Sequence, residues 1–172
     1  VPAPKYAGHF SDLPLSTPPS FNEGDISDKP SFMQNVPLMS QPYIDLSKQS
    51  YQTRREALLS VDDMVEKLVG ALKVAGQLDN TVIIFTSDNG YFQGQHRLPI
   101  EKRLVYEEAV RVPLIVRGPG FPIKVTSEQM VANIDLPATI LDLAIAYPGR
   151  DLDGHTLVDS IKPGFPWRKE LL

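Results

Sequence analysis

The stretch TVIIFTSDNG, residues 81–90, decides the fold class, because an apolar run leads directly into an acid, an amide and a glycine. Residues 81–85 form a continuous, largely apolar and β-branched run without alternation, which is typical of a strand buried on both faces of a sheet. In open α/β sheets, ligands bind at the carboxyl ends of the strands. Asp88 and Asn89 stand at that end, and Gly90 behind them favours a tight turn.

The segments around this strand have the periodicities of helices and of one further strand. Apolar residues recur at three- and four-residue steps from 58 to 75, and Gly76 is placed to end that helix in the left-handed conformation. A second strand is expected at 110–116, where Pro113 indicates an edge position or a bulge. Residues 135–146 return to helical spacing with Pro137 in the first turn. Helix, strand, strand, helix predicts an α/β fold with a sheet sandwiched by helices.

Composition excludes several classes of function. The net charge of −4 and the pI near 5.3 argue against nucleic-acid binding. No run approaches the roughly 18 apolar residues of a membrane span. The chain has no cysteine, so disulfides, thiolate metal sites and a cysteine nucleophile are excluded within its 172 residues.

The acid and the amide at the strand end are hard oxygen donors, which suit Ca²⁺ or Mg²⁺. The alternative is that SDNG is only a turn, because Asp and Asn-Gly are common turn residues. Asp62 and Asp63 are expected to be a solvated helix face, since neighbours about 100° apart on a helix cannot converge on one ion. Asp135 is expected to be the acid at a helix N-terminus.

The longer pattern TSDNGY, GQ, LPI, KR, YE and VPLIVRGPG, within residues 86–120, resembles the type I sulfatases of the alkaline phosphatase superfamily. LLSVDDMVEKLV precedes this pattern, and VANIDLPATILDLA and DGHTL follow it, in the family's order. The resemblance runs from about residue 60 to 157. It is strongest to the branch that acts on N-acetylglucosamine 6-sulfate groups of glycosaminoglycans.

The resemblance implies a division of the chain. Residues 51–147 correspond to the C-terminal half of the sulfatase catalytic domain, lacking its N-terminal strands. Residues 148–172 correspond to a linker or the start of a C-terminal subdomain. Half of the 16 prolines lie within residues 1–50, which are expected to be a loop segment wrapping the domain. The missing N-terminal part of the same domain is then an expected partner.

The resemblance also implies roles for single residues. Asp88 and Asn89 correspond to two of the family's Ca²⁺ ligands, and Lys102 to its sulfate-contacting catalytic lysine. His96 and Arg97 lie on the same loop and are candidates for substrate binding, with plain loop residues as the alternative. The implied substrates are sulfated carbohydrates or aryl sulfate esters, and the family's compartments are lysosomal, periplasmic or extracellular.

The family's nucleophile is a formylglycine made in a C/S-x-P-x-R motif, and the chain contains no such motif. The formylglycine is therefore expected upstream, and the 172 residues alone are expected to be inactive. Two alternatives stay open. One is a phosphatase or phosphodiesterase of the same superfamily, and the other is a non-catalytic metal- or sugar-binding pseudoenzyme.

Overall fold

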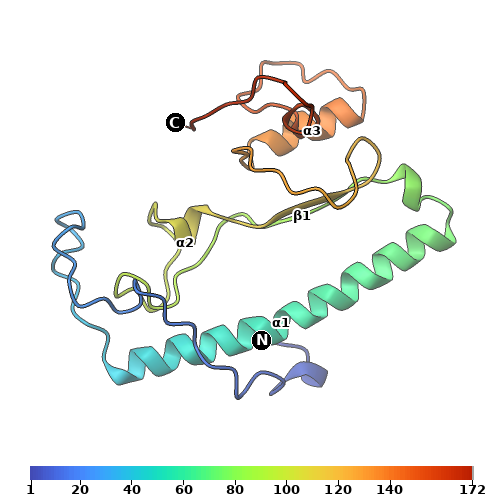
Figure 1. The fold of residues 1–172 in the computed structure, drawn as a ribbon. Helices are drawn as coiled ribbons and strands as arrows, with labels where there is room; N and C mark the ends of the chain where they lie inside the picture. The colour runs from blue at the N-terminus through green and yellow to red at the C-terminus, as the bar shows by residue number, and fades with distance from the viewer. Residues whose placement is uncertain (172) are drawn as a thin grey trace. The chain divides into compact units, whose positions relative to one another are not determined.

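The structure is a computed structural model that describes residues 1–171. Its elements are η1 (Pro4–Tyr6), α1 (Gln41–Val74), η2 (Leu78–Asn80), β1 (Ile83–Thr86), α2 (Glu107–Val110), β2 (Leu114–Arg117), α3 (Asp135–Leu143) and α4 (Leu157–Ser160). The chain forms two compact units (Figure 1), residues 1–78 with 86–114, and residues 79–85 with 115–172.

The first unit is built on α1, which is drawn as one continuous long helix in Figure 1. Its C-terminus is as expected, because Gly76 has a φ of 64° and the Gln77 amide donates to the Leu72 carbonyl over 2.9 Å. This arrangement satisfies carbonyls that the last turn would otherwise leave unpaired. Its N-terminus is not as expected, because the helix begins at Gln41, within residues 1–50 that are predicted to be a loop segment. Pro42 lies in the first turn, where its missing amide costs no hydrogen bond.

The segment before α1 is held by buried apolar side chains of its own and by hydrogen bonds to α1. Ile26, Met33 and Met39 are buried in it, at 5%, 2% and 8% exposure. Lys5 and the Tyr6 hydroxyl both donate to the Asp63 carboxylate, the latter over 2.6 Å, and so attach η1 to α1. Asp62 is exposed as expected, whereas Asp63 is half-buried and paired instead of solvated. The proline-rich segment binds to the polar face of the helix.

The sheet of the described residues has two strands, β1 and β2. The mixed α/β class is confirmed, but burial of β1 on both faces is not, because Phe85 is 36% exposed. Residues 110–113 are not part of the second strand: Val110 ends α2, and β2 begins at Leu114 directly after Pro113. Proline has no amide for a strand ladder, which accounts for this start.

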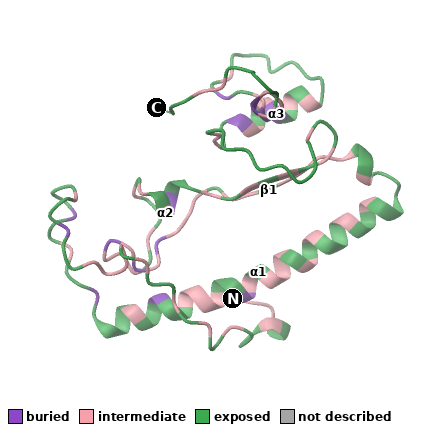
Figure 2. Cartoon of the chain, in the orientation of Figure 1, coloured by how far each residue is buried: buried purple, intermediate pink, exposed green. Residues whose placement is uncertain are grey.

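In the second unit, α3 packs against α4. Asp135 begins α3 as the expected N-terminal acid, and it is fully buried. Its carboxylate accepts the amides of Ala132 and His155, each over 2.9 Å, and pairs with Arg168. The acid therefore fixes the C-terminal segment of the unit. Figure 2 shows few fully buried residues along the chain, with one group of them on α3.

Candidate functional site

The turn that follows β1 is organised by its own side chains. The Ser87 hydroxyl donates to the Asn89 carbonyl over 2.8 Å, and the Asn89 amide donates to the Asp88 carboxylate over 2.9 Å. Asp88 is exposed and Asn89 is half-buried. The expected acid and amide therefore stand in a defined turn directly beyond the strand.

Gly90 is required here by close packing, not by the left-handed conformation that a tight turn would need. Its amide donates to the Ala109 carbonyl over 2.8 Å, which binds the turn to α2. A Cβ atom at this position would lie 2.0 Å from the Glu108 carbonyl oxygen. Only glycine permits this approach, and α2 thereby becomes the support of the Asp88–Asn89 turn.

Lys102 is brought to the same turn by a bridge between two parts of the following loop. The Phe92 amide donates to the Glu101 carbonyl over 2.9 Å, and Phe92 is completely buried. From this position the Lys102 ammonium reaches the Asn89 side-chain oxygen at 3.5 Å, a long hydrogen bond. Lys102 and Asn89, which are 13 residues apart, thus meet at one place, with Asp88 beside them in the chain.

Glu101 holds the backbone on which Lys102 stands. Its carboxylate accepts the amides of Lys102 and Arg103 at 2.8 and 3.0 Å, and the Arg103 guanidinium at 3.0 and 3.1 Å. The Arg103 side chain, followed by the two amides, lowers the pKa of Glu101 to about 2. No pattern in the sequence indicates this contribution of Glu101.

His96 lies in the first unit between two carboxylates. Its Nδ1 is 2.7 Å from a Glu23 oxygen and its Nε2 is 3.4 Å from a Glu108 oxygen, while its ring stacks on Tyr106 at 4.3 Å. The residue is 9% exposed and has a φ of 54°. These contacts connect the N-terminal segment to α2, and a role of His96 in substrate binding stays a prediction.

Arg97 uses its guanidinium to hold the N-terminal segment. Its nitrogens donate to the backbone carbonyls of Glu23, Gly24 and Val36 over 2.9, 2.7 and 2.8 Å. The predicted contact of Arg97 with substrate also stays a prediction. The contacts that the structure shows for it are those of a residue that shapes the loop.

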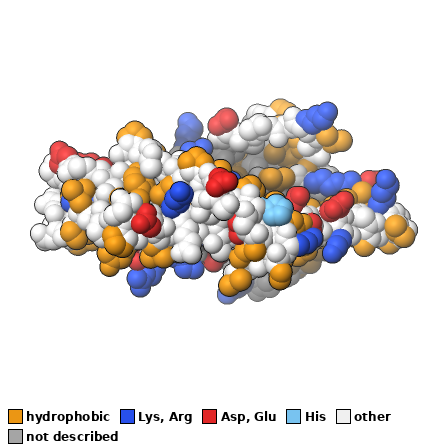
Figure 3. Space-filling view, turned by 90° about the horizontal axis from the view of Figure 1, so that it is seen from below, with side chains coloured by type: hydrophobic (Ala, Val, Ile, Leu, Met, Phe, Trp, Pro, Cys, Tyr) orange, Lys and Arg blue, Asp and Glu red, His pale blue; other side chains and the backbone are white. Residues whose placement is uncertain are grey.

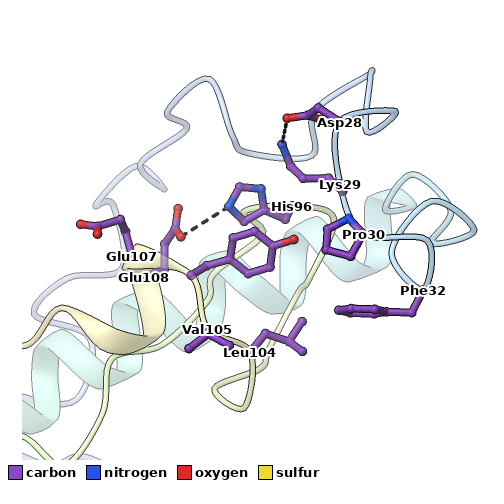
Figure 4. Close-up of a pocket in the computed structure, with 10 residues that line it drawn as sticks. Asp28, Lys29, Pro30, Phe32, His96, Leu104, Val105, Glu107 and Glu108 are labelled. Carbon is purple, nitrogen blue, oxygen red and sulfur yellow. Dashed lines mark hydrogen bonds and ion pairs between the residues drawn. The ribbon is translucent and has the colours of Figure 1, made fainter. Parts of the chain in front are cut away.

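A hollow of about 660 Å³ adjoins His96 (Figure 4). Figure 4 shows His96 paired with Glu108 on one side and Lys29 paired with Asp28 on another, with Phe32 and Leu104 as apolar lining. The hollow belongs to the first unit, and Asp88, Asn89 and Lys102 are not among its lining residues.

Comparison with known proteins places the chain in a family. The family description "Sulfatase" matches residues 6–146. The chain belongs to the sulfatase family. The expected family is thereby confirmed, together with the α/β fold expected for it.

Individual sulfatases show how much of the family's length is present. The human N-acetylglucosamine-6-sulfatase is 41% identical over 177 residues, which cover 99% of this chain and 31% of that protein. The chain therefore spans about a third of the length of the N-acetylglucosamine-6-sulfatases it matches.

Two solved structures are similar in fold. A protein in complex with its substrate D-glucosamine-2-N,6-O-disulfate matches with a TM-score of 0.70 and 23% identity, over 98% of this chain and 47% of that one. A phosphonate monoester hydrolase from Silicibacter pomeroyi matches with a TM-score of 0.51 and 34% identity, over 62% of this chain and 22% of that one.

The donor atoms at the turn fit Ca²⁺ as part of a larger ligand set. Asp88 offers a carboxylate and Asn89 an amide oxygen, both hard donors, whereas Ca²⁺ takes six to eight oxygens. Within residues 1–171, no group of three or more His, Cys, Asp or Glu side chains gathers to hold an ion.

In the described part of the chain, no helix combines the length and the apolar character needed to cross a bilayer.

Proposed function

We propose that the protein containing this chain hydrolyses sulfate esters of sugars, of the class of N-acetylglucosamine 6-sulfate. Membership of the sulfatase family and the 41% identity to a human N-acetylglucosamine-6-sulfatase support this substrate class. The observation that carries the proposal is the 3.5 Å approach of the Lys102 ammonium to the Asn89 side-chain oxygen. At this place, just beyond β1, a cation contacts a neutral oxygen donor, and the anionic Asp88 precedes that donor in the chain.

Each of the three residues has a role in the proposed reaction. Asp88 and Asn89 would supply two oxygen ligands to Ca²⁺, and the bound ion would polarise the sulfate oxygens. Lys102 binds a sulfate oxygen and offsets the negative charge that develops on it. An ammonium suits this role because it is a compact charge on a flexible stem. The formylglycine nucleophile would come from outside these 172 residues.

The metal proposal predicts a specific effect of Asp88. In the protein that contains this chain, Asp88→Ala removes a charged ligand and should weaken Ca²⁺ binding at least about tenfold, or 1.4 kcal/mol. Calorimetric titration of the metal-free protein with Ca²⁺ measures this affinity. Asp62→Ala, which removes an exposed carboxylate on α1, is the matched control and should leave the affinity unchanged. Equal affinity in both variants would contradict the assignment of Asp88.

A second candidate function is hydrolysis of phosphonate or phosphate monoesters. The 34% identity to a phosphonate monoester hydrolase favours it, although the matched part is 62% of this chain. Both reactions need a cation for the non-bridging oxygens of a tetrahedral anion, and Lys102 can serve either.

Turnover of matched esters separates the two functions. N-acetylglucosamine 6-sulfate, an aryl sulfate and an aryl phosphonate of the same leaving group are given to the purified protein with and without chelation of Ca²⁺. We expect kcat/KM for the sulfates to exceed that for the phosphonate by at least about 100-fold, or roughly 2.7 kcal/mol of transition-state binding. A preference for the phosphonate would overturn the sulfatase proposal in favour of the second candidate.

A further inference from the structure

The loop that carries Lys102 has a feature that its assigned chemistry does not explain. Glu101 directs its carboxylate back onto the two residues that follow it, although solvent is available on this part of the surface. Its side chain is 23% exposed, whereas that of its partner Arg103 is 83% exposed. The side chain is therefore folded against the backbone and not extended into water.

The contacts of Glu101 concentrate on the Lys102 peptide. One carboxylate oxygen accepts the amides of Lys102 and Arg103 at 2.8 and 3.0 Å, so the chain on both sides of the Lys102 α-carbon is fixed to a single atom. The Arg103 guanidinium donates to both oxygens of the carboxylate, at 3.0 and 3.1 Å, and so fixes its orientation. Hydrogen bonds to a charged acceptor are stronger than neutral ones.

We call the Glu101 carboxylate, together with the Lys102 and Arg103 groups that donate to it, the clamp. The clamp is itself anchored in the interior of the first unit. The Glu101 carbonyl accepts the amide of Phe92, which is completely buried. The Glu101 carboxylate thus binds the backbone of Lys102, while the Glu101 carbonyl binds the backbone of a buried residue. The chain position of Lys102 is fixed before its flexible side chain begins.

We propose that Glu101 is a positioning residue that acts through Lys102, holding the lysine backbone so that the ammonium stays beside the Asp88–Asn89 turn. The proposal rests on the function proposed for Lys102. A lysine side chain has four rotatable bonds, so a fixed origin limits the region its ammonium can occupy. Misplacement of a substrate-contacting group by about 1 Å can cost 100-fold in rate.

The low pKa of Glu101, about 2, is consistent with this role because the carboxylate is ionised at all pH values well above 2. The clamp is then permanent and does not switch with pH. Replacement of the carboxylate, not protonation, is the change that tests it.

The experiment is a double-mutant cycle in the protein that contains this chain. Glu101→Ala should lower kcat/KM for the sulfate ester by about 10- to 100-fold in the wild-type background. In the Lys102→Ala background, the same substitution should change kcat/KM less than about threefold, because its effect passes through the lysine. Glu101→Asp should recover a large part of the activity, since aspartate also accepts the amide two residues ahead. Glu66→Ala, an exposed glutamate of α1, is the control.

A second measurement does not depend on any enzymatic activity. Hydrogen exchange at the amides of Lys102 and Arg103 should become roughly five- to tenfold faster in Glu101→Ala, because each loses a charged acceptor. Equal losses of kcat/KM in both backgrounds, or unchanged exchange at these amides, would overturn the positioning role. If the wild-type protein has no sulfate-ester activity, the proposed function fails while the exchange rates still decide whether the clamp exists.

Discussion

At the scale of the residue, contacts within a short stretch of sequence could be predicted, whereas contacts between distant positions could not. The turn formed by Asp88 and Asn89 could be predicted from its place after an apolar run, and the motif resemblance pointed to Lys102, which lies at that turn. The contacts of His96 and Arg97 with residues 23–36 could not be predicted, because they join positions more than 60 residues apart. No local pattern in a single sequence indicates such pairings.

A substitution of Arg97 tests whether this side chain shapes the loop or binds the substrate. Arg97→Lys keeps the charge but cannot direct three donors at three separate carbonyls, so the protein should lose about 2–3 kcal/mol of unfolding free energy with KM unchanged. Urea denaturation and steady-state kinetics measure the two quantities. Arg111→Lys, at a side chain that is 83% exposed, should change stability by less than about 0.5 kcal/mol. A raised KM with full stability would instead favour substrate binding by Arg97.

The titration of Glu101 follows from its contacts. Its pKa is lowered from 4.5 to about 2, chiefly by Arg103, so its contribution to stability is present above pH 4.5 and is lost as the pH falls through about 2. Carboxyl carbon NMR should give a midpoint near 2 in the wild-type protein and a higher midpoint in Arg103→Ala. A wild-type midpoint at the ordinary value of about 4.5 would show that the clamp does not form in solution.

At the scale of the element, some helix and strand ends could be predicted from the sequence and others could not. The C-terminus of α1 was predicted because Gly76 has one clear structural use. Its N-terminus was missed because Pro42 suggested a loop, although proline is also tolerated in a first helical turn. The short helix α2 lies where a strand was expected at Val110, and its packing against Gly90 depends on contacts that periodicity does not encode.

The approach of α2 to Gly90 is tested by adding one methyl group. Gly90→Ala places a Cβ 2.0 Å from the Glu108 carbonyl oxygen and should destabilise the protein by roughly 2–3 kcal/mol, as overpacking does. Gly70→Ala is the matched control, because nothing lies within 4 Å of its Cβ within α1 and alanine favours helix by about 1 kcal/mol. Chemical denaturation of both variants gives the comparison. Equal stabilities would show that α2 does not approach the turn as described.

At the scale of the whole molecule, the two units bury little apolar surface of their own. Large apolar side chains such as Leu58 and Met64 on α1, at 50% and 58%, and Ile115 on β2, at 62%, are substantially exposed. Figure 3 shows apolar side chains on the surface among acidic and basic ones. The continuous apolar character of 81–85 therefore predicted the strand correctly and its burial incorrectly. Burial depends on neighbouring layers, and the described residues form only a two-stranded sheet.

The central claim, that Lys102 acts with Asp88 and Asn89 on a sulfate ester, is tested most directly by removing the ammonium. In the protein that contains this chain, Lys102→Ala should lower kcat/KM for N-acetylglucosamine 6-sulfate by about 100- to 1,000-fold, as loss of one charge-stabilising donor does. Lys48→Ala, at an exposed lysine on α1, should leave it unchanged. A Lys102→Ala variant whose kcat/KM stays within about threefold of the wild-type value would contradict the claim.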